Sequence, residues 1–150
     1  MTTKTAKTKK PEPVKSTGPY DLFKNNEELE SGAGVTIEYP GFSITIHRAG
    51  GSNKRFAQLL NAKMKPYRHQ FERGMLADDV SRRILLESYA EGVVIGWKNV
   101  KDADGNVMEF TKANAVKLFS DLPDLFSDIK QQAENAALFR EEQEKADEKN

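Results

Sequence analysis

Apolar and polar residues alternate in two short runs in the first third of the chain. In Val35–Tyr39 and Phe42–His47 every second residue is apolar, which is the period of a strand with one buried face. Pro40 and Gly41 separate the runs and are typical of a tight turn. The pattern predicts a β-hairpin whose apolar face is covered by other elements, because two strands alone are only marginally stable. His47 occupies a polar position of this alternation, and we expect its side chain at the surface.

After the hairpin, the apolar residues follow the 3.6-residue period of a helix. Ser52 or Asn53 can cap this helix, and Pro66 ends or kinks it. A short helix can resume at Tyr67 and end before Gly74. The first helix carries one apolar stripe, which consists of Phe56, Leu59, Leu60 and Met64.

The longest helical pattern runs from Asp79 to about Val100. Gly92 and Gly96 lie four residues apart within it, and we expect another backbone to approach the helix closely there. We place Trp97 in the core or at its edge. The apolar run is too short to span a membrane. The helix has a broad apolar band, which consists of Val80, Ile84, Leu85, Tyr89, Val93, Val94, Trp97 and Val100.

Two further helices are predicted in the last third, after a short strand-like segment at Val107–Phe110. Thr111 caps the first of them, and Pro123 lies in the first turn of the second. The core-facing residues are Ala115, Val116, Phe119 and Leu122 in the first, then Leu125, Phe126, Ile129, Ala133, Ala136 and Phe139. The fold class is therefore α+β and mostly α-helical, with an N-terminal β-hairpin packed against about four helices.

The composition indicates that the core residues are concentrated in one part of the chain. The 150 residues suffice for one domain, and 37% of them are apolar and 31% charged. Residues 1–19 contain five lysines and one glutamate, and residues 141–150 contain five acidic residues and two lysines. Neither segment has enough apolar residues to offset the conformational entropy that it would lose on folding. We expect a disordered tail at 1–19, a single domain at 20–140 and a charged tail at 141–150.

The sequence has little catalytic or ligand-binding equipment. It contains no cysteine and two histidines, and it lacks the spacings of nucleophile, phosphate-loop and zinc motifs. The segment Asp102–Asn106 is not an EF-hand loop, because Val100 and Thr111 stand where the first and twelfth ligands need carboxylates. We expect no enzyme, no catalytic residue, no cofactor and no metal. The polar start, Met1–Lys10, does not have the apolar core of a signal peptide.

One stretch, Arg48–Arg73, is strongly basic, with seven basic residues and a single acidic one, Glu72. Aromatic residues lie among the basic ones, which is typical of surfaces that bind single-stranded nucleic acid. The alternative is a solvated face that complements an acidic neighbour. The whole chain has 23 basic and 23 acidic residues, which favours the second interpretation and makes nucleic acid an unlikely partner.

Several short segments follow one another in a recognisable order between about Tyr20 and Asn150. They are Arg48–Gly51, Met64–Arg68, Gly96–Val100, Asp102–Asn106, Phe110–Thr111, Leu118–Phe126 and Ala136–Arg140. In this order they resemble the tail assembly chaperone family of long-tailed bacteriophages, specifically the siphovirus type. No single segment is diagnostic, and the lysine-rich tail lies outside the resemblance.

The resemblance implies a non-enzymatic assembly factor that is made in the host cytoplasm and is absent from the mature virion. Such proteins bind the tape measure protein, keep it soluble and recruit the tail tube protein during tail morphogenesis. A longer form arises in this family by ribosomal frameshifting. The polar C-terminal end of this chain is compatible with the shorter form.

A chaperone of this kind needs an accessible apolar surface. In the last predicted helix, Leu125, Phe126, Ile129 and Phe139 either contact a partner or cover the protein's own core. The opposite charges of the two tails also permit self-association. Two other interpretations stay open at this point. One is a small nucleic-acid-binding accessory protein that uses the Arg48–Arg73 face, and the other is a minor structural protein of the virion.

Overall fold

A computed structural model describes residues 18–140, and nearly all of the two predicted tails lies outside this range. The α+β fold class is confirmed. In chain order the elements are α1 (Pro19–Phe23), a π-helical turn η3 (Glu28–Gly32), β1 (Val35–Tyr39), β2 (Phe42–Ile46), α2 (Lys54–Met64), a 3-10 turn η4 (Lys65–Tyr67), α3 (Arg68–Glu72), α4 (Asp78–Gly92), β3 (Val94–Lys98), α5 (Lys112–Asp121) and α6 (Pro123–Glu134).

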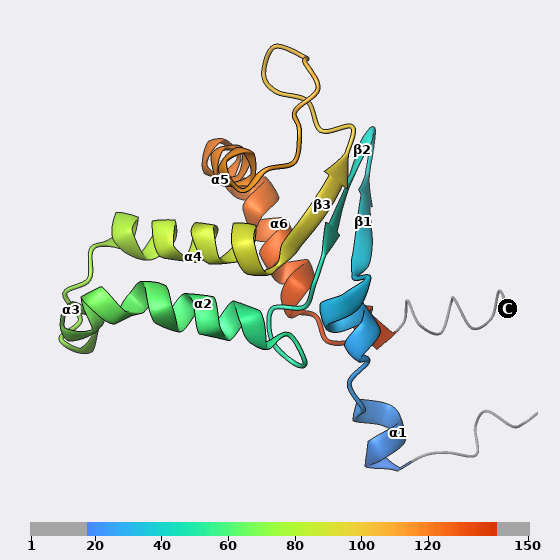
Figure 1. The fold of residues 1–150 in the computed structure, drawn as a ribbon, viewed down its shortest axis with the longest axis horizontal. Helices are drawn as coiled ribbons and strands as arrows, with labels where there is room; N and C mark the ends of the chain where they lie inside the picture. The colour runs from blue at the N-terminus through green and yellow to red at the C-terminus, as the bar shows by residue number, and fades with distance from the viewer. Residues whose placement is uncertain (1–17, 141–150) are drawn as a thin grey trace, which may run out of the picture.

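The three strands form one antiparallel sheet in the order β1-β2-β3 (Figure 1). The predicted hairpin is confirmed, with Ile37 opposite Ile44, and Ile44 in turn lies opposite Trp97 of β3. The residues of one sheet face, Val35, Ile37, Ile44 and Ile46, are buried in the core. The predicted position of Trp97 is also confirmed, because it packs against the core edge-to-face with Phe110 at 5.1 Å.

The predicted helix from Asp79 to Val100 is wrong in its last third. Helix α4 ends at Gly92, and Val94–Lys98 is instead the third strand. The residues Val93, Val94 and Ile95 are β-branched, and a short apolar run of this kind does not distinguish a strand from a buried helix by its period. Gly92 does meet another backbone, as predicted, because an added Cβ would lie 3.1 Å from Cα of Phe56. Gly96 faces open space instead.

Two smaller predictions also need correction. The segment Val107–Phe110 forms no strand and contributes only a single bridge between Val107 and Lys101. Leu122 lies in the non-helical junction between α5 and α6 and is half exposed, so it does not face the core. The cap at Thr111 is confirmed, since its hydroxyl accepts a hydrogen bond from the backbone N–H of Asn114 at 3.0 Å.

Residues 54–92 form a helical arm that projects from the sheet (Figure 1). Helices α2 and α4 run side by side along it, and η4 and α3 make the turn at its tip. At its base the buried amide of Asn53 donates hydrogen bonds to the carbonyls of Arg48 and Gly92, at 2.7 and 2.8 Å. The sequence predicts Ser52 or Asn53 as the cap of α2. Asn53 occupies the cap position, but its side chain forms no capping hydrogen bond.

Helix α6 lies where the arm meets the sheet (Figure 1). Tyr89 of α4 is fully buried there, and it packs edge-to-face with Phe56 of α2 and Phe126 of α6 at 5.0 and 5.3 Å. The hydroxyl of Tyr39 in β1 donates a hydrogen bond to Asp128 of α6 at 2.5 Å. These contacts make a single core from the sheet, the base of the arm and the last two helices.

Candidate functional site: an apolar groove on the helical arm

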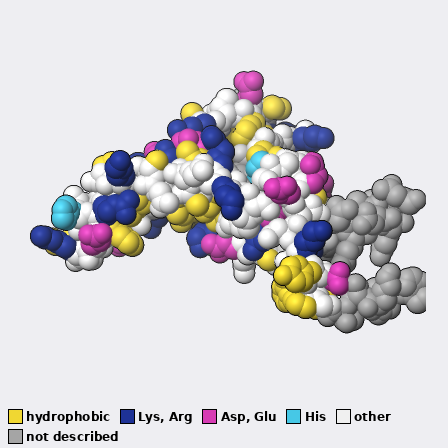
Figure 2. Space-filling model, turned by 60° about the horizontal axis from the view of Figure 1, so that its bottom comes forward, with side chains coloured by type: hydrophobic (Ala, Val, Ile, Leu, Met, Phe, Trp, Pro, Cys, Tyr) yellow, Lys and Arg dark blue, Asp and Glu magenta, His cyan; other side chains and the backbone are white. Residues whose placement is uncertain are grey.

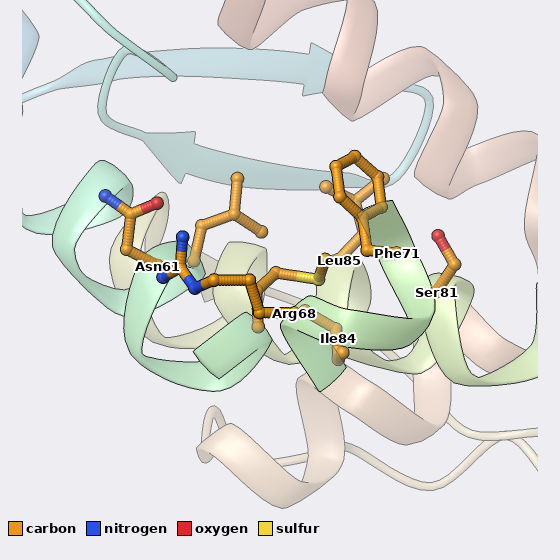
Figure 3. A pocket seen from close by; sticks show the side chains of 8 residues that line it. Asn61, Arg68, Phe71, Ser81, Ile84 and Leu85 are labelled. Carbon is orange, nitrogen blue, oxygen red and sulfur yellow. The ribbon is translucent and has the colours of Figure 1, made fainter. Parts of the chain in front are cut away.

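A groove of about 340 Å³ lies on the outer half of the arm, between α2, α3 and α4 (Figure 3). This volume is at the lower end of the range of roughly 300–1,000 Å³ that is typical of ligand pockets. The lining residues are mostly apolar, and they are Leu60, Asn61, Met64, Arg68, Phe71, Ser81, Ile84 and Leu85.

Helical periodicity places the apolar lining on facing sides of the two long helices. Leu60 and Met64 lie one turn apart on α2, and Ile84 and Leu85 are adjacent on α4. Ile84 is buried at the floor, and the other three are half-buried. The same stripe of α2 is covered at its inner end, where Phe56 packs on the core. At its outer end Leu60 and Met64 are only half-buried and line the groove.

Apolar side chains are also exposed around the tip of the arm. Phe71 of α3 lines the groove and is 60% exposed, and Met75 in the following loop is 71% exposed. Single exposed apolar residues are common on protein surfaces, but an apolar groove with a large exposed side chain such as Phe71 in its lining is typical of a binding surface. The space-filling view shows yellow side chains among the blue ones along this arm (Figure 2).

The charge around the groove is positive. Residues 54–91 contain eight basic and five acidic side chains, a difference of three. Arg68 lines the groove and forms no ion pair with any other residue in the range 18–140. An occupant that is apolar on one side and carries acidic groups at its edge is therefore complementary to this surface in polarity and in charge.

A three-part ion network holds the arm against α5. Lys63 of α2 lies 2.9 Å from the carboxylate of Glu91 on α4, and Lys112 of α5 pairs with the same carboxylate. Hydrogen bonds from Lys112 and Lys63 hold the pKa of Glu91 below its usual value, although burial opposes this shift. The hydrogen bond to Glu91 in turn raises the pKa of Lys63. Lys63 is therefore engaged within the protein rather than free to bind a phosphate group.

The basic stretch Arg48–Arg73 is thus only partly available to a nucleic acid. In addition to Lys63, Arg48 is engaged, with its guanidinium 2.8 Å from the carboxylate of Glu30. Arg68 and Arg73 lie at the outer end of the arm, on or next to α3. Neither arginine forms an ion pair with another residue of the range 18–140.

The candidate contact residues in the last helix lie in or against the protein's own core. Ile129 and Phe139 are 0% exposed, so no partner reaches them in this fold. Leu125 and Phe126 are half-buried and pack against the core, and the ring of Phe126 lies 5.5 Å from that of Phe119. The burial of Ile129 and Phe139, and the packing of Leu125 and Phe126 against the core, support the interpretation that all four cover the core. Of the four, only Leu125 and Phe126 retain surface for a partner.

A buried carboxylate that the sequence did not single out fixes the segment before the sheet. Glu30 in η3 is fully buried, and it accepts hydrogen bonds from Ser52, Arg48 and Asn25 at 2.7 to 3.1 Å. Burial alone would raise the pKa of Glu30, but these hydrogen bonds outweigh it and hold the pKa below the ordinary value. The cluster ties α1 and its linker to the start of the arm.

The remaining candidate features are a metal site, a membrane-spanning helix and His47. Within residues 18–140, no group of three or more His, Cys, Asp and Glu side chains is placed to hold a metal ion. None of the helices in that range is long and apolar enough to cross a membrane. His47 is partly exposed, and its Nε2 lies 2.8 Å from the carbonyl oxygen of Gly32.

The fold and the groove define a small α+β domain with an apolar groove on a projecting helical arm. A family model described as YdaY prophage protein matches residues 51–150, which is two thirds of the chain. The chain belongs to this phage-derived family, and the match includes the whole arm. Neither a curated protein nor a solved structure shows significant similarity to the chain.

Proposed function

We propose that this phage-derived protein is a tail assembly chaperone that binds the tape measure protein, keeps it soluble and helps to recruit the tail tube protein. Two observations from outside the site support the proposal. The chain belongs to a prophage protein family, and its segments from about Tyr20 onward resemble those of tail assembly chaperones. The observation that carries the proposal is the open apolar groove with a basic rim on the helical arm.

The groove has the chemistry needed to shield an amphipathic helix. Helix-in-groove recognition places apolar residues of the ligand, spaced by three or four positions, into a hydrophobic cleft. Leu60, Met64 and Leu85 offer such a cleft, and Arg68 offers a charge for acidic residues on the flank of the ligand. A long helical client aggregates through its apolar stripes, so covering one stripe in each bound copy keeps the client in solution.

The proposal has consequences for where the protein acts. It works in the host cytoplasm, where the client is synthesised, and it leaves before the tail is complete. Mass spectrometry of purified phage particles separates it from a minor structural protein, because a chaperone is missing from the particles. A longer frameshifted form, if it is made, carries the same arm and therefore the same groove.

Co-expression with the tape measure protein of the same phage tests the proposal. We expect the client to be soluble after centrifugation when this chain is present, to be insoluble without it, and to co-purify with it. The matched variants are Phe71→Asp in the groove and Val107→Asp in a distant loop, both at exposed positions. Capture that is lost with the first variant and kept with the second supports the groove as the contact. Insoluble client in the presence of the wild-type chain contradicts the proposal.

A further inference from the structure

Helix α1 presents a small group of exposed apolar side chains, at Tyr20, Leu22 and Phe23, which we call the knob. Tyr20, Leu22 and Phe23 are 86%, 55% and 68% exposed, and α1 has no buried residue. The only ring contact of this segment is the guanidinium of Arg140, which lies 5.6 Å from the centre of the Phe23 ring, in the part of the chain that the structure describes. In Figure 2 the knob is the yellow cluster beside the grey atoms, with an acidic side chain next to it.

Hydrogen bonds fix the segment that directly follows the knob. Two residues after Phe23, the side chain of Asn25 donates a hydrogen bond to Glu30 at 3.1 Å. The carboxylate of Glu30 is bound at the same time to Arg48 and Ser52. The start of the helix is set by Pro19, whose fixed φ suits the first turn. A segment placed in this way loses less conformational entropy on binding than a free tail does.

We propose that the knob, residues Tyr20–Phe23 of one copy, occupies the arm groove of a second copy of this chain. The knob is apolar and carries Asp21, and the groove is apolar and carries Arg68, which has no ion pair within residues 18–140, so the two surfaces are complementary in polarity and in charge. Figure 1 shows α1 and the arm tip at widely separated places on the molecule. The contact is therefore between different patches of the two copies.

A contact between unlike patches does not close a dimer. Each copy that gives its knob to one neighbour keeps its own groove free for the next, so the copies assemble head to tail. Two aromatic rings and a leucine bury roughly 500 Å² at most on the knob side. An interface of about 1,000 Å² in total is at the weak end of specific contacts, so we expect association that depends on concentration.

The inference does not depend on the proposed function, but it bears on it. A client helix that uses the same groove has the same chemistry as the knob, so client and neighbour compete. The knob then covers the groove in the free protein and leaves it when the client binds. A failure of self-association leaves the proposed function untouched, and a failure of client capture leaves the self-association untouched.

Cysteine crosslinking of the full chain tests the contact, because the sequence contains no cysteine of its own. We use Leu22→Cys for the knob, Asn61→Cys for the groove and Val107→Cys as an exposed control, with one copy labelled with ¹⁵N and a short bismaleimide as crosslinker. The knob and groove variants, when mixed, should give the mixed dimer at least tenfold more than the control and groove variants. The double variant Leu22→Cys/Asn61→Cys should give a ladder of oligomers. A double variant that crosslinks only within single chains overturns the proposal, as does a yield equal to the control.

Sedimentation over a concentration series gives an independent test that does not depend on crosslinking. Replacing Leu22 and Phe23 by Ser should give a monomer at concentrations where the wild type associates, with an unchanged thermal midpoint, because α1 lies outside the core. Asp21→Lys and Arg68→Glu should each weaken association roughly two- to fivefold, and the two together should restore it. A wild type that stays monomeric, or a serine variant that associates as the wild type does, contradicts the proposal. A double variant Asp21→Lys/Arg68→Glu that does not restore association also contradicts the proposal.

Discussion

The carboxylate of Glu30 binds both donors of Ser52, with its Oε1 2.8 Å from the backbone nitrogen and 2.7 Å from the hydroxyl oxygen. These residues are 22 positions apart in the sequence. Their contact joins the segment that carries α1 to the first turn before the arm. The same carboxylate pairs with Arg48, so one buried side chain fixes the knob, the end of the hairpin and the base of the arm relative to one another.

The first prediction concerns this carboxylate. Glu30→Gln keeps the size of the side chain and removes its charge, which leaves Arg48 without its ionic partner. We expect the free energy of unfolding to fall by about 2–4 kcal/mol, since breaking a buried pair leaves an uncompensated charge. Urea denaturation at pH 7 measures the loss. The matched variant Glu27→Gln changes an exposed carboxylate in the same segment and should alter stability by less than about 0.5 kcal/mol.

The pH dependence of stability gives a second readout of the same group. The pKa of Glu30 is below 4.5 in the folded protein, so the unfolded chain binds its proton more readily. The stabilisation is complete at neutral pH and is lost as the pH falls below 4.5 and through the folded-state pKa. Glu30→Gln should remove this part of the acid-induced loss, so that the two stability curves approach each other as the pH falls below 4.5 and through the folded-state pKa. A constant difference at all pH values contradicts this assignment.

A close approach at Gly92 leads to a further prediction. An added Cβ would meet Cδ1 of Leu59 at 2.9 Å and Cα of Phe56 at 3.1 Å, and the second atom is backbone that moves only with helix α2. Gly92→Ala should therefore destabilise the protein by about 1–3 kcal/mol, although alanine is the better helix former. Gly96→Ala, where nothing lies within 4 Å, is the matched control and should change stability by less than about 0.5 kcal/mol. Thermal unfolding of both variants tests this prediction, and a Gly92→Ala variant more stable than the wild type would contradict it.

The hydroxyl of Tyr39 is the subject of another prediction. Burial raises the pKa of Tyr39, and the hydrogen bond to Asp128 raises it further, so the phenol stays protonated well above pH 10. Tyr39→Phe retains the ring stacked on Phe42, with centroids 4.8 Å apart, and leaves Asp128 without its donor. We expect a loss of about 1–2 kcal/mol in the free energy of unfolding. Ultraviolet titration should also show one late-titrating tyrosine fewer in the variant.

The position of Ile129 in the core predicts how a variant there behaves. Ile129→Asp places a charge at a site with no exposure, so it should unfold the protein or lower the free energy of unfolding by more than about 3 kcal/mol. Phe71→Asp at the groove should leave the thermal midpoint within a few degrees of the wild type, because the ring is 60% exposed. Circular dichroism distinguishes these results. Loss of client capture by Ile129→Asp would therefore reflect unfolding rather than a lost contact.

Periodicity predicted most elements of this fold from the sequence, because their patterns are local. The alternation in Val35–Tyr39 and the stripe of α2 each have one regular period over their whole length. Strand β3 was missed because Val94–Lys98 follows directly on a helix and its apolar run fits either period. The bonds of Glu30 were missed for another reason, since its partners Arg48 and Ser52 are distant in the sequence.

The candidate site was harder to predict than the fold. An apolar stripe has the same pattern whether another element covers it or not. The stripe of α6 was singled out, but Ile129 is covered by the protein's own core. On α2, Leu60 and Met64 are left open because the arm projects beyond the sheet and the last helices, and only the arrangement in space shows this (Figures 1 and 3).

Binding of the tape measure protein in the arm groove, as proposed, is tested most directly by the soluble fraction of that client in cells that co-express matched variants. We predict that the wild type, Val107→Asp and the variant with Ser at positions 22 and 23 all keep the client soluble and co-purify with it. We predict that Phe71→Asp, which should fold as the wild type does because the ring is exposed, leaves most of the client in the pellet. Client that stays soluble and captured with Phe71→Asp and with Met64→Asp would contradict the claim.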